Sequence, residues 1–229
     1  MSEINSVGEQ QSKKPKKRCI VYVDGFNLYY GVLRHRPDWK WLNLETFFRA
    51  LRPDEEIVCI KYCTAEIDPD KRVSVRRDRQ KMYFNALETL ETVHRIEGKY
   101  QLRDETCRAN GCNQGLEYKR PEEKKTDVNL AIEMVLDAID GKADTMILVS
   151  GDSDQEPAVA AVRKRCPHIK VIVYIPVIPI PGSPRMNHNH KKTGALCGEL
   201  PLAGMSAHQL ASDLMHPKGN VLNRPAEWG

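Results

Sequence analysis

The chain has 229 residues, of which 41 % are hydrophobic and 29 % charged, enough for one substantial core but not for two full domains. The formal net charge is +4, and most of it comes from the first 18 residues, so the remainder is nearly neutral and lacks the charge of a DNA-coating protein. No apolar stretch approaches the roughly 20 residues needed to cross a bilayer, and the polar start lacks the apolar segment of a secretion signal. We therefore expect a cytoplasmic protein.

Residues 1–18 are predicted to be a basic, disordered tail. The run Lys-Lys-Pro-Lys-Lys-Arg at 13–18 is either a solvated segment or one that steers the chain toward nucleic acid phosphates. The seven cysteines are odd in number and their spacings form no disulfide framework, which fits a reducing compartment.

Four short, nearly apolar runs rich in β-branched residues follow the tail. They span residues 19–23, 57–63, 145–149 and 170–175. Strands that are buried on both faces have this composition, so the runs predict a mainly parallel sheet.

Helical patterns lie between these strands, at about residues 44–51, 77–93, 128–139 and 155–165. The clearest has an apolar stripe that we expect to pack on the core, made of Val128, Ala131, Ile132, Val135, Leu136 and Ile139. Gly141 then supplies a helix stop. Alternating strands and helices predict a wound α/β sandwich over residues 19–176.

Two segments do not follow this alternation. Residues 98–126 combine glycines, a proline and many charges, which predicts a long functional flap or a disordered loop. After Ile175, four prolines at 176, 179, 181 and 184 indicate that the compact fold ends, leaving residues 177–229 as a C-terminal extension with one short helix at 205–215.

Four aspartates stand where an apolar run ends or a helical pattern begins: Asp24, Asp127, Asp152 and Asp154. Ligands of an open α/β sheet bind beyond the carboxyl ends of its strands, where the strand order reverses. If these carboxylates meet there, two unit charges about 4 Å apart repel by roughly 4 kcal/mol at an effective dielectric constant near 20. A bound divalent cation would relieve that repulsion, so the pattern predicts a metal site.

Carboxylate oxygens with waters suit Mg²⁺ or Mn²⁺, and a metal-bound water can attack a phosphodiester. Asn27 is a candidate to hold that water or a phosphate, and Ser150 and Ser153 to orient the carboxylates. The alternative is that Asp127 and Asp152 or Asp154 simply cap helices, each contributing about 1 kcal/mol. Asp24 has no predicted helix to cap, which favours the metal site.

The same residues carry a family resemblance, in Tyr-Val-Asp-Gly-Phe-Asn-Leu-Tyr at 22–29, Lys-Thr-Asp-Val at 125–128 and Ile-Leu-Val-Ser-Gly-Asp-Ser-Asp at 147–154. From residue 19 to 175 the chain resembles NYN-domain proteins, which are related to the PIN-like nucleases. The resemblance implies a Rossmann-like α/β/α sandwich and a ribonuclease whose Mg²⁺-binding residues match Asp24, Asp127, Asp152 and Asp154. Gln155 departs from the pattern, because this position is commonly aromatic in the family.

The whole chain, including Arg-Pro-Ala-Glu-Trp at 224–228, also resembles bacterial NYN-domain proteins named 6-hydroxy-3-succinoylpyridine 3-monooxygenase. That resemblance implies an NADH-using step of nicotine breakdown, with flavin as a further candidate cofactor. The chain has no Gly-x-Gly-x-x-Gly turn, and Asp24 places a carboxylate where a dinucleotide phosphate would lie. A third alternative is a catalytically inactive RNA-binding module. The sequence is compatible with a homo-oligomer as well as with a monomer.

Other chemistry-bearing residues are weaker candidates. Cys107 and Cys112 lack a matching second pair for structural zinc, and His188 with His190 has the surroundings of a solvated tail. Arg72, Arg76 and Arg79 fall on one side of a helix and form either an exposed face or a phosphate-binding rim. The aromatic residues Phe26, Tyr29 and Tyr30 either stack on bases or belong to the core.

Overall fold

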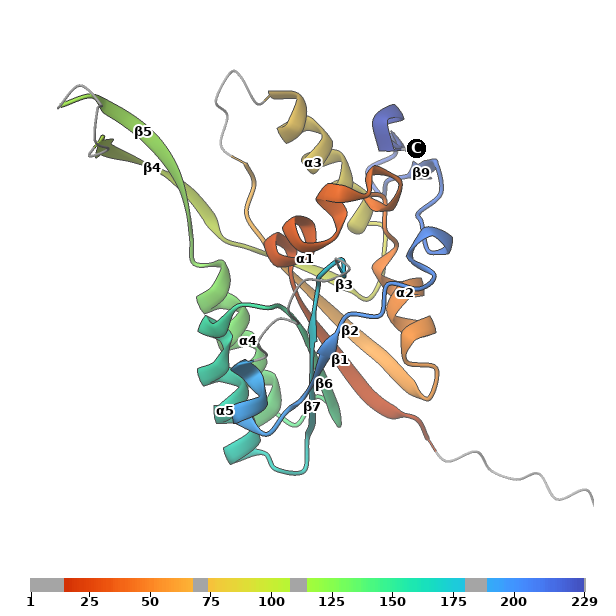
Figure 1. Cartoon of the computed structure of the whole chain (residues 1–229). Coiled ribbons are helices and arrows are strands. Elements are labelled where there is room, and N and C mark those ends of the chain that lie inside the picture. Colours follow the sequence, from red (N-terminus) through yellow and green to blue (C-terminus); the bar gives the residue numbers. More distant parts are fainter. Residues whose placement is uncertain (1–14, 68–73, 108–114, 180–188, 229) are drawn as a thin grey trace, which may run out of the picture.

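The central feature of the fold is a parallel sheet with the strand order β3-β2-β1-β6-β7-β8. The computed structural model describes residues 15–67, 74–107, 115–179 and 189–228, and these six strands lie within them (Figure 1). The strands are β1 (Lys17–Asp24), β2 (Glu55–Thr64), β3 (Val93–Glu97), β6 (Thr145–Val149), β7 (Lys170–Ile175) and β8 (Leu196–Glu199). The four predicted strands are confirmed, and β3 and β8 were not predicted.

Strand β1 lies at the point where the winding of the sheet reverses. On one side it pairs with β2, the next strand of the sheet along the chain, and on the other it pairs with β6, with Val23 opposite Val149. The carboxyl ends of β1 and β6 are therefore neighbours at the switch point of the sheet.

Helices cover both faces of the sheet, which makes an α/β/α sandwich as predicted (Figure 1). One face carries α1 (Gly25–Gly31), α2 (Leu44–Leu51) and α3 (Ser74–Leu87), and the other carries α4 (Thr126–Ile139) and α5 (Glu156–Arg165). Short 3₁₀ helices lie at Leu33–His35, Pro37–Trp39 and Ser153–Gln155. Pro157 lies in the first turn of α5, where no backbone N–H is required of it.

Helix α4 packs on the sheet with the face opposite to the predicted one. Leu130, Met134 and Ala138 are buried in the core on the side where α4 contacts β1 and β2, whereas four members of the expected core stripe are exposed: Val128, Ile132, Leu136 and Ile139. Both faces of α4 carry apolar residues, so periodicity did not identify the buried one. The helix predicted at 77–93 is α3, which ends at Leu87, and Val93 is instead the first residue of β3.

The segment 98–126, predicted to be a flap or a disordered loop, contains two strands. These are β4 (Lys99–Thr106) and β5 (Glu117–Lys124), an antiparallel pair that projects away from the sandwich (Figure 1). Most of the described side chains on β4 are exposed, so the pair is held mainly by its backbone ladder.

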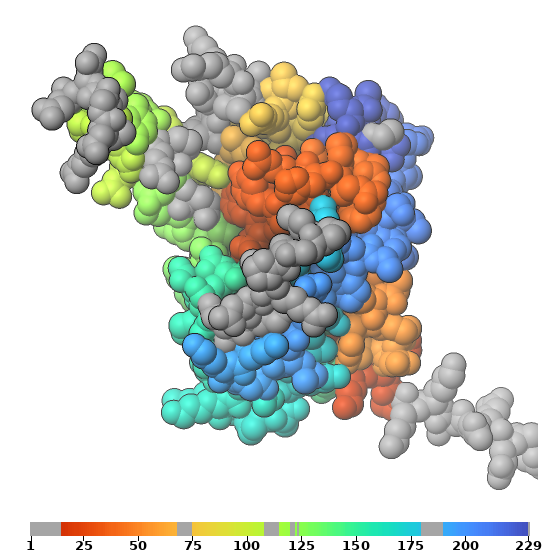
Figure 2. All heavy atoms as spheres, viewed as in Figure 1, coloured from red at the N-terminus to blue at the C-terminus, as the bar shows by residue number. Residues whose placement is uncertain are grey.

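The C-terminal segment continues the packed structure beyond Ile175, where we expected the compact fold to end. It supplies β8 to the sheet, then β9 (Asp213–Met215) and β10 (Val221–Asn223), with 3₁₀ helices at Asn189–Thr193, Met205–Ala207 and Ala226–Trp228 instead of one helix at 205–215. The Trp228 ring lies 6.0 Å from the Trp41 ring. Figure 2 shows this blue segment against the orange region that includes α1. None of the helices in the described ranges has the length and apolarity of a membrane span.

Candidate functional site at the carboxyl ends of β1 and β6

Asp24 is the last residue of β1 and also the N-cap of α1. Its carboxylate accepts hydrogen bonds from the Asn27 backbone N–H at 2.9 Å and from the Asn27 side-chain amide at 2.6 Å. The expectation that Asp24 caps no helix was therefore wrong. The side chain is only 2 % exposed, so the cap lies inside the protein.

Two hydrogen bonds join the turn after β6 to the turn after β1, and a third lies within the turn after β6. The Ser150 hydroxyl donates to the second carboxylate oxygen of Asp24 at 2.9 Å and accepts from the Asp152 N–H at 3.1 Å. The Gly151 N–H donates to the side-chain oxygen of Asn27 at 3.1 Å. Asp24, Asn27, Ser150 and the backbone of Asp152 thus form one connected site.

Asp152 and Asp154 differ in their roles. The Asp152 carboxylate caps the 3₁₀ helix at Ser153–Gln155 by accepting a hydrogen bond from the Asp154 N–H at 2.9 Å. The alternative that Asp152 caps a helix is therefore correct for this hydrogen bond. Asp154 and Ser153 are exposed beside it.

Asp127 joins the site through Gln155. It lies in the first turn of α4 but is not the N-cap, which is Lys125 with a left-handed φ of 77°. The fully buried Gln155 side chain donates to the Asp127 carbonyl oxygen at 3.2 Å and lies 3.5 Å from its carboxylate. A polar side chain at position 155 thus links α4 to the turn after β6, which a phenylalanine could not do by hydrogen bonding.

The electrostatics of the site are those of uncompensated negative charge. Burial raises the pKa of Asp24, hydrogen bonds from Asn27 and Ser150 oppose that rise, and the charge of Asp152 adds to it. Burial also raises the pKa of Cys63, and the charges of Asp24 and Asp127 contribute. Within the described part of the chain, neither Asp24 nor Asp152 forms an ion pair with a lysine or arginine.

The carboxylates of the described residues do not surround a single point as a complete set of metal ligands would. Among residues 15–67, 74–107, 115–179 and 189–228, no three acidic, histidine or cysteine side chains are close enough to hold one ion together. Mg²⁺ is usually held by one or two carboxylates, and waters and substrate phosphates complete its shell. A site built on Asp24 and Asp152, with oxygen donors only, fits that coordination chemistry.

His190 is a buried neighbour of the site that the sequence did not identify. It is 1 % exposed, and its Nε2 lies 2.9 Å from the Asp152 carbonyl oxygen, whereas we expected a solvated tail. Its Nδ1 is buried without a hydrogen-bond partner among the described residues. The surrounding prolines and polar residues give no signal for this burial. Arg72, Cys112 and His188 lie outside the described residues.

A comparison with protein families decides the classification of the chain. The family model described as NYN domain matches residues 18–183, which include the whole site. The chain belongs to the NYN-domain family. NYN domains are PIN-like, nuclease-type domains and generally act on nucleic acid, so the family points to a hydrolase of the nuclease type.

The chain is also similar to one named protein and to one solved structure. 6-hydroxy-3-succinoylpyridine 3-monooxygenase HspA of Pseudomonas putida (strain DSM 28022 / S16) is 31 % identical over 189 residues, covering 69 % of this chain and 59 % of that protein. The NYN-domain chain thus spans less than two thirds of that relative's length. A solved structure of a protein of unknown function from Vibrio parahaemolyticus RIMD 2210633 has a TM-score of 0.41 and 22 % identity, covering 69 % of this chain and 81 % of the other.

Proposed function

We propose that this NYN-domain protein is a Mg²⁺- or Mn²⁺-dependent ribonuclease that hydrolyses RNA phosphodiester bonds at the carboxyl ends of β1 and β6. In this proposal Asp24 and Asp152 bind the ion, Asp127 and Asp154 complete the acidic set, and Asn27 holds a phosphate or the attacking water. The observation that carries the proposal is the 2 % exposed Asp24 carboxylate, which accepts hydrogen bonds from neutral donors and has no cationic side chain paired with it in the described chain.

The donors around Asp24 fix the direction of its carboxylate. Asn27 and Ser150 hold both oxygens, so the group does not rotate when a ligand arrives and little reorganisation is needed. A bound divalent ion would supply an acidified water and neutralise charge on the phosphate. The cap hydrogen bond from Asp154 holds Asp152 in the same way.

The test is cleavage of a fluorescent single-stranded RNA by the purified full-length protein. We expect cleavage with added Mg²⁺ or Mn²⁺, none in EDTA, and a loss of at least about 100-fold in Asp24→Asn and in Asp152→Asn. Asp144→Asn is the matched control, because Asp144 is an exposed aspartate that pairs with Arg18 beyond the opposite end of the sheet. Its activity should equal that of the wild type.

Two results would contradict the proposal. Normal cleavage by Asp24→Asn and Asp152→Asn would remove the assigned residues. RNA binding without turnover in any divalent metal would make the protein an inactive RNA-binding module instead.

A second candidate function is an NADH-dependent 6-hydroxy-3-succinoylpyridine 3-monooxygenase, which the 31 % identity to HspA favours. It requires NADH oxidation that depends on the pyridine substrate, in protein freed of contaminating enzymes. The turn at Asp24 does not favour a dinucleotide phosphate, because the buried carboxylate would repel it. NADH oxidation that depends on the pyridine substrate, together with no cleavage of RNA in the presence of Mg²⁺ or Mn²⁺, would favour the monooxygenase over the ribonuclease.

A further inference from the structure

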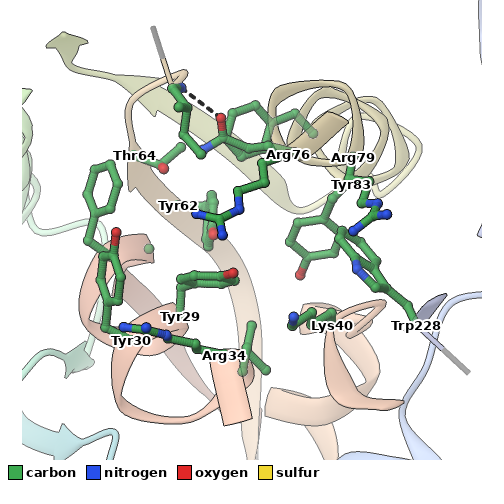
Figure 3. A pocket seen from close by; sticks show the side chains of 16 residues that line it. Tyr29, Tyr30, Arg34, Lys40, Tyr62, Thr64, Arg76, Arg79, Tyr83 and Trp228 are labelled. Atoms are coloured by element: carbon green, nitrogen blue, oxygen red, sulfur yellow. Dashed lines mark hydrogen bonds between the residues drawn. The ribbon is translucent and has the colours of Figure 1, made fainter. Parts of the chain in front are cut away.

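A cavity begins one residue beyond Asp24. It has a volume of about 430 Å³ and lies between α1, α3 and the carboxyl end of β2. We call it the α1–α3 pocket and define it by six of its lining residues: Tyr29, Arg34, Lys40, Tyr62, Arg76 and Arg79 (Figure 3). The volume lies within the range of about 300–1,000 Å³ that is usual for small-ligand sites.

The pocket carries positive charge that the protein only partly neutralises. Among the described residues, its lining includes four cationic side chains and no carboxylate. Burial lowers the pKa of Lys40, and the charges of Arg79 and Arg76 lower it further. Arg79 pairs with Glu227, but Lys40 and Arg76 have no carboxylate partner in the described ranges. An anion bound between Lys40 and Arg76 would relieve this repulsion.

Aromatic groups line the same space. The Lys40 ammonium lies 5.7 Å from the centre of the Tyr29 ring, and the Arg34 guanidinium lies 5.9 Å from that of Tyr30. Figure 3 shows the Tyr29 ring between Arg34 and the cations of α3. Tyr62 is 4 % exposed, lines the pocket, and its hydroxyl makes no hydrogen bond to any described residue. A hydroxyl in the pocket wall that makes no hydrogen bond to these residues is a donor available to a ligand.

The pocket and the acidic site share one turn. Gly25 lines the pocket and directly follows Asp24. A Cβ at Gly25 would lie 2.8 Å from the Tyr62 ring, so the lack of a side chain lets this turn pack closely against the pocket wall. A polymer whose phosphate lies at Asp24 therefore reaches the pocket with its adjoining nucleotide.

We propose that the α1–α3 pocket binds one nucleotide of a single-stranded RNA next to the bond that is cleaved, its phosphate between Lys40 and Arg76 and its base against Tyr29. This inference rests on the proposed ribonuclease function, because that function places the strand at Asp24. The pocket has room for a single nucleotide and supplies the two interactions that single-strand binding uses, cations for the backbone and aromatic faces for bases.

The test measures equilibrium binding of a short, labelled single-stranded RNA to the full-length protein in EDTA, where the proposed cleavage cannot occur. We expect Lys40→Ala/Arg76→Ala to weaken binding by about 10-fold or more and to reduce its salt dependence, because two phosphate contacts are lost. Tyr29→Ala should weaken it about 10-fold, while Tyr29→Phe should retain it. Arg165→Ala, which removes an exposed cation from α5 on the other face, is the control.

The outcomes separate the pocket from the nuclease. Wild-type affinity in the folded Lys40→Ala/Arg76→Ala protein would overturn the pocket assignment even if Mg²⁺-dependent cleavage is found. Weakened RNA binding in a protein that never cleaves RNA would support the pocket and remove the nuclease. Lys40-dependent binding of a small aromatic acid such as 6-hydroxy-3-succinoylpyridine, with no binding of RNA, would overturn the RNA assignment.

Discussion

The hydroxyl of Tyr22 donates a 2.9 Å hydrogen bond to the carboxylate of Asp137, 115 residues along the chain. Asp137 is 1 % exposed and also contacts Lys61 and, at 3.0 Å, the Lys142 ammonium. Asp24 and Asp137 are thus buried aspartates with opposite surroundings. Asp137 is neutralised by its own lysines, whereas Asp24 is surrounded by neutral donors, which distinguishes a structural carboxylate from one available to a ligand.

Removing the carboxylate of Asp137 should destabilise the fold. We expect Asp137→Ala to lower the free energy of unfolding by about 3–5 kcal/mol, because Lys61 loses its buried partner, and Tyr22→Phe to lower it by about 1 kcal/mol. Asp140→Ala, at an exposed aspartate that pairs with Lys142, should cost less than about 1 kcal/mol. Urea unfolding at pH 7 measures all three, and equal losses for Asp137 and Asp140 would contradict the assignment.

The contacts of Asp137 also predict how the free energy of unfolding depends on pH. Burial raises the pKa of Asp137, but the hydrogen bonds from Lys61, Lys142 and Tyr22 outweigh burial and leave that pKa below its usual value. A lowered folded-state pKa contributes stability that is complete above the unfolded pKa, near about 4, and is lost as the pH falls through the folded value. The stability difference between wild type and Asp137→Ala should therefore shrink in acid. If the two proteins differ in free energy of unfolding by the same amount at every pH down to acid unfolding, the pKa of Asp137 is not lowered in the folded state.

Asp24 predicts the opposite pH dependence and a coupling to metal. Its folded-state pKa is raised, chiefly by burial, so its contribution to stability is present below the unfolded pKa and is lost as the pH rises through the folded value. Mg²⁺ binds the ionised form, so added Mg²⁺ should stabilise the wild type at neutral pH, by about 2.7 kcal/mol at 100 times its Kd. Thermal unfolding of wild type and Asp24→Asn with and without Mg²⁺ measures this, and the variant should not respond. An identical response of both proteins would place the ion elsewhere.

The two faces of α4 should respond differently to substitution. Met134→Ala leaves a cavity under the sheet and should cost about 2–5 kcal/mol. Ile132→Gln and Leu136→Gln change exposed positions of the same helix and should each stay within about 0.5 kcal/mol. Urea unfolding of the three variants compares them, and a large loss at Ile132 or Leu136 would show that this face is covered in solution.

Gly31 is predicted to accept no side chain. A Cβ there would lie 1.9 Å from the carbonyl oxygen of Pro176, which is rigid backbone. Gly31→Ala should therefore destabilise the fold by about 1–3 kcal/mol. Gly198→Ala is the matched control, since nothing lies within 4 Å of a Cβ there. Thermal unfolding of both proteins tests the difference, and a stable Gly31→Ala protein would mean that α1 and the segment after β7 move apart easily.

The sandwich was predictable because its inner strands are buried on both faces and their composition records that burial. Residues 19–23 and 145–149 read as strands for this reason, and the same argument placed Asp24 and Asp152 at strand ends. The capping role of Asp24 was missed because α1 is only seven residues long and has glycine at both ends, which gives a weak helical pattern.

The remaining errors have tertiary causes. The buried face of α4 was misjudged because Leu130 and Met134 compete with an equally apolar outer stripe, and only docking on the sheet selects between them. β8 has four residues and includes Gly198, so its strand character comes from pairing with β7. The α1–α3 pocket joins Lys40, Arg76 and Trp228 from distant parts of the chain, and no local pattern announces such a cavity.

The bond between Ser150 and Asp24 spans 126 residues, and its two strands pair only when the second half of the chain is present. The long closure makes this a late event in folding. A fragment of the chain that ends before β6 therefore lacks Ser150 and Asp152 and with them half of the proposed site.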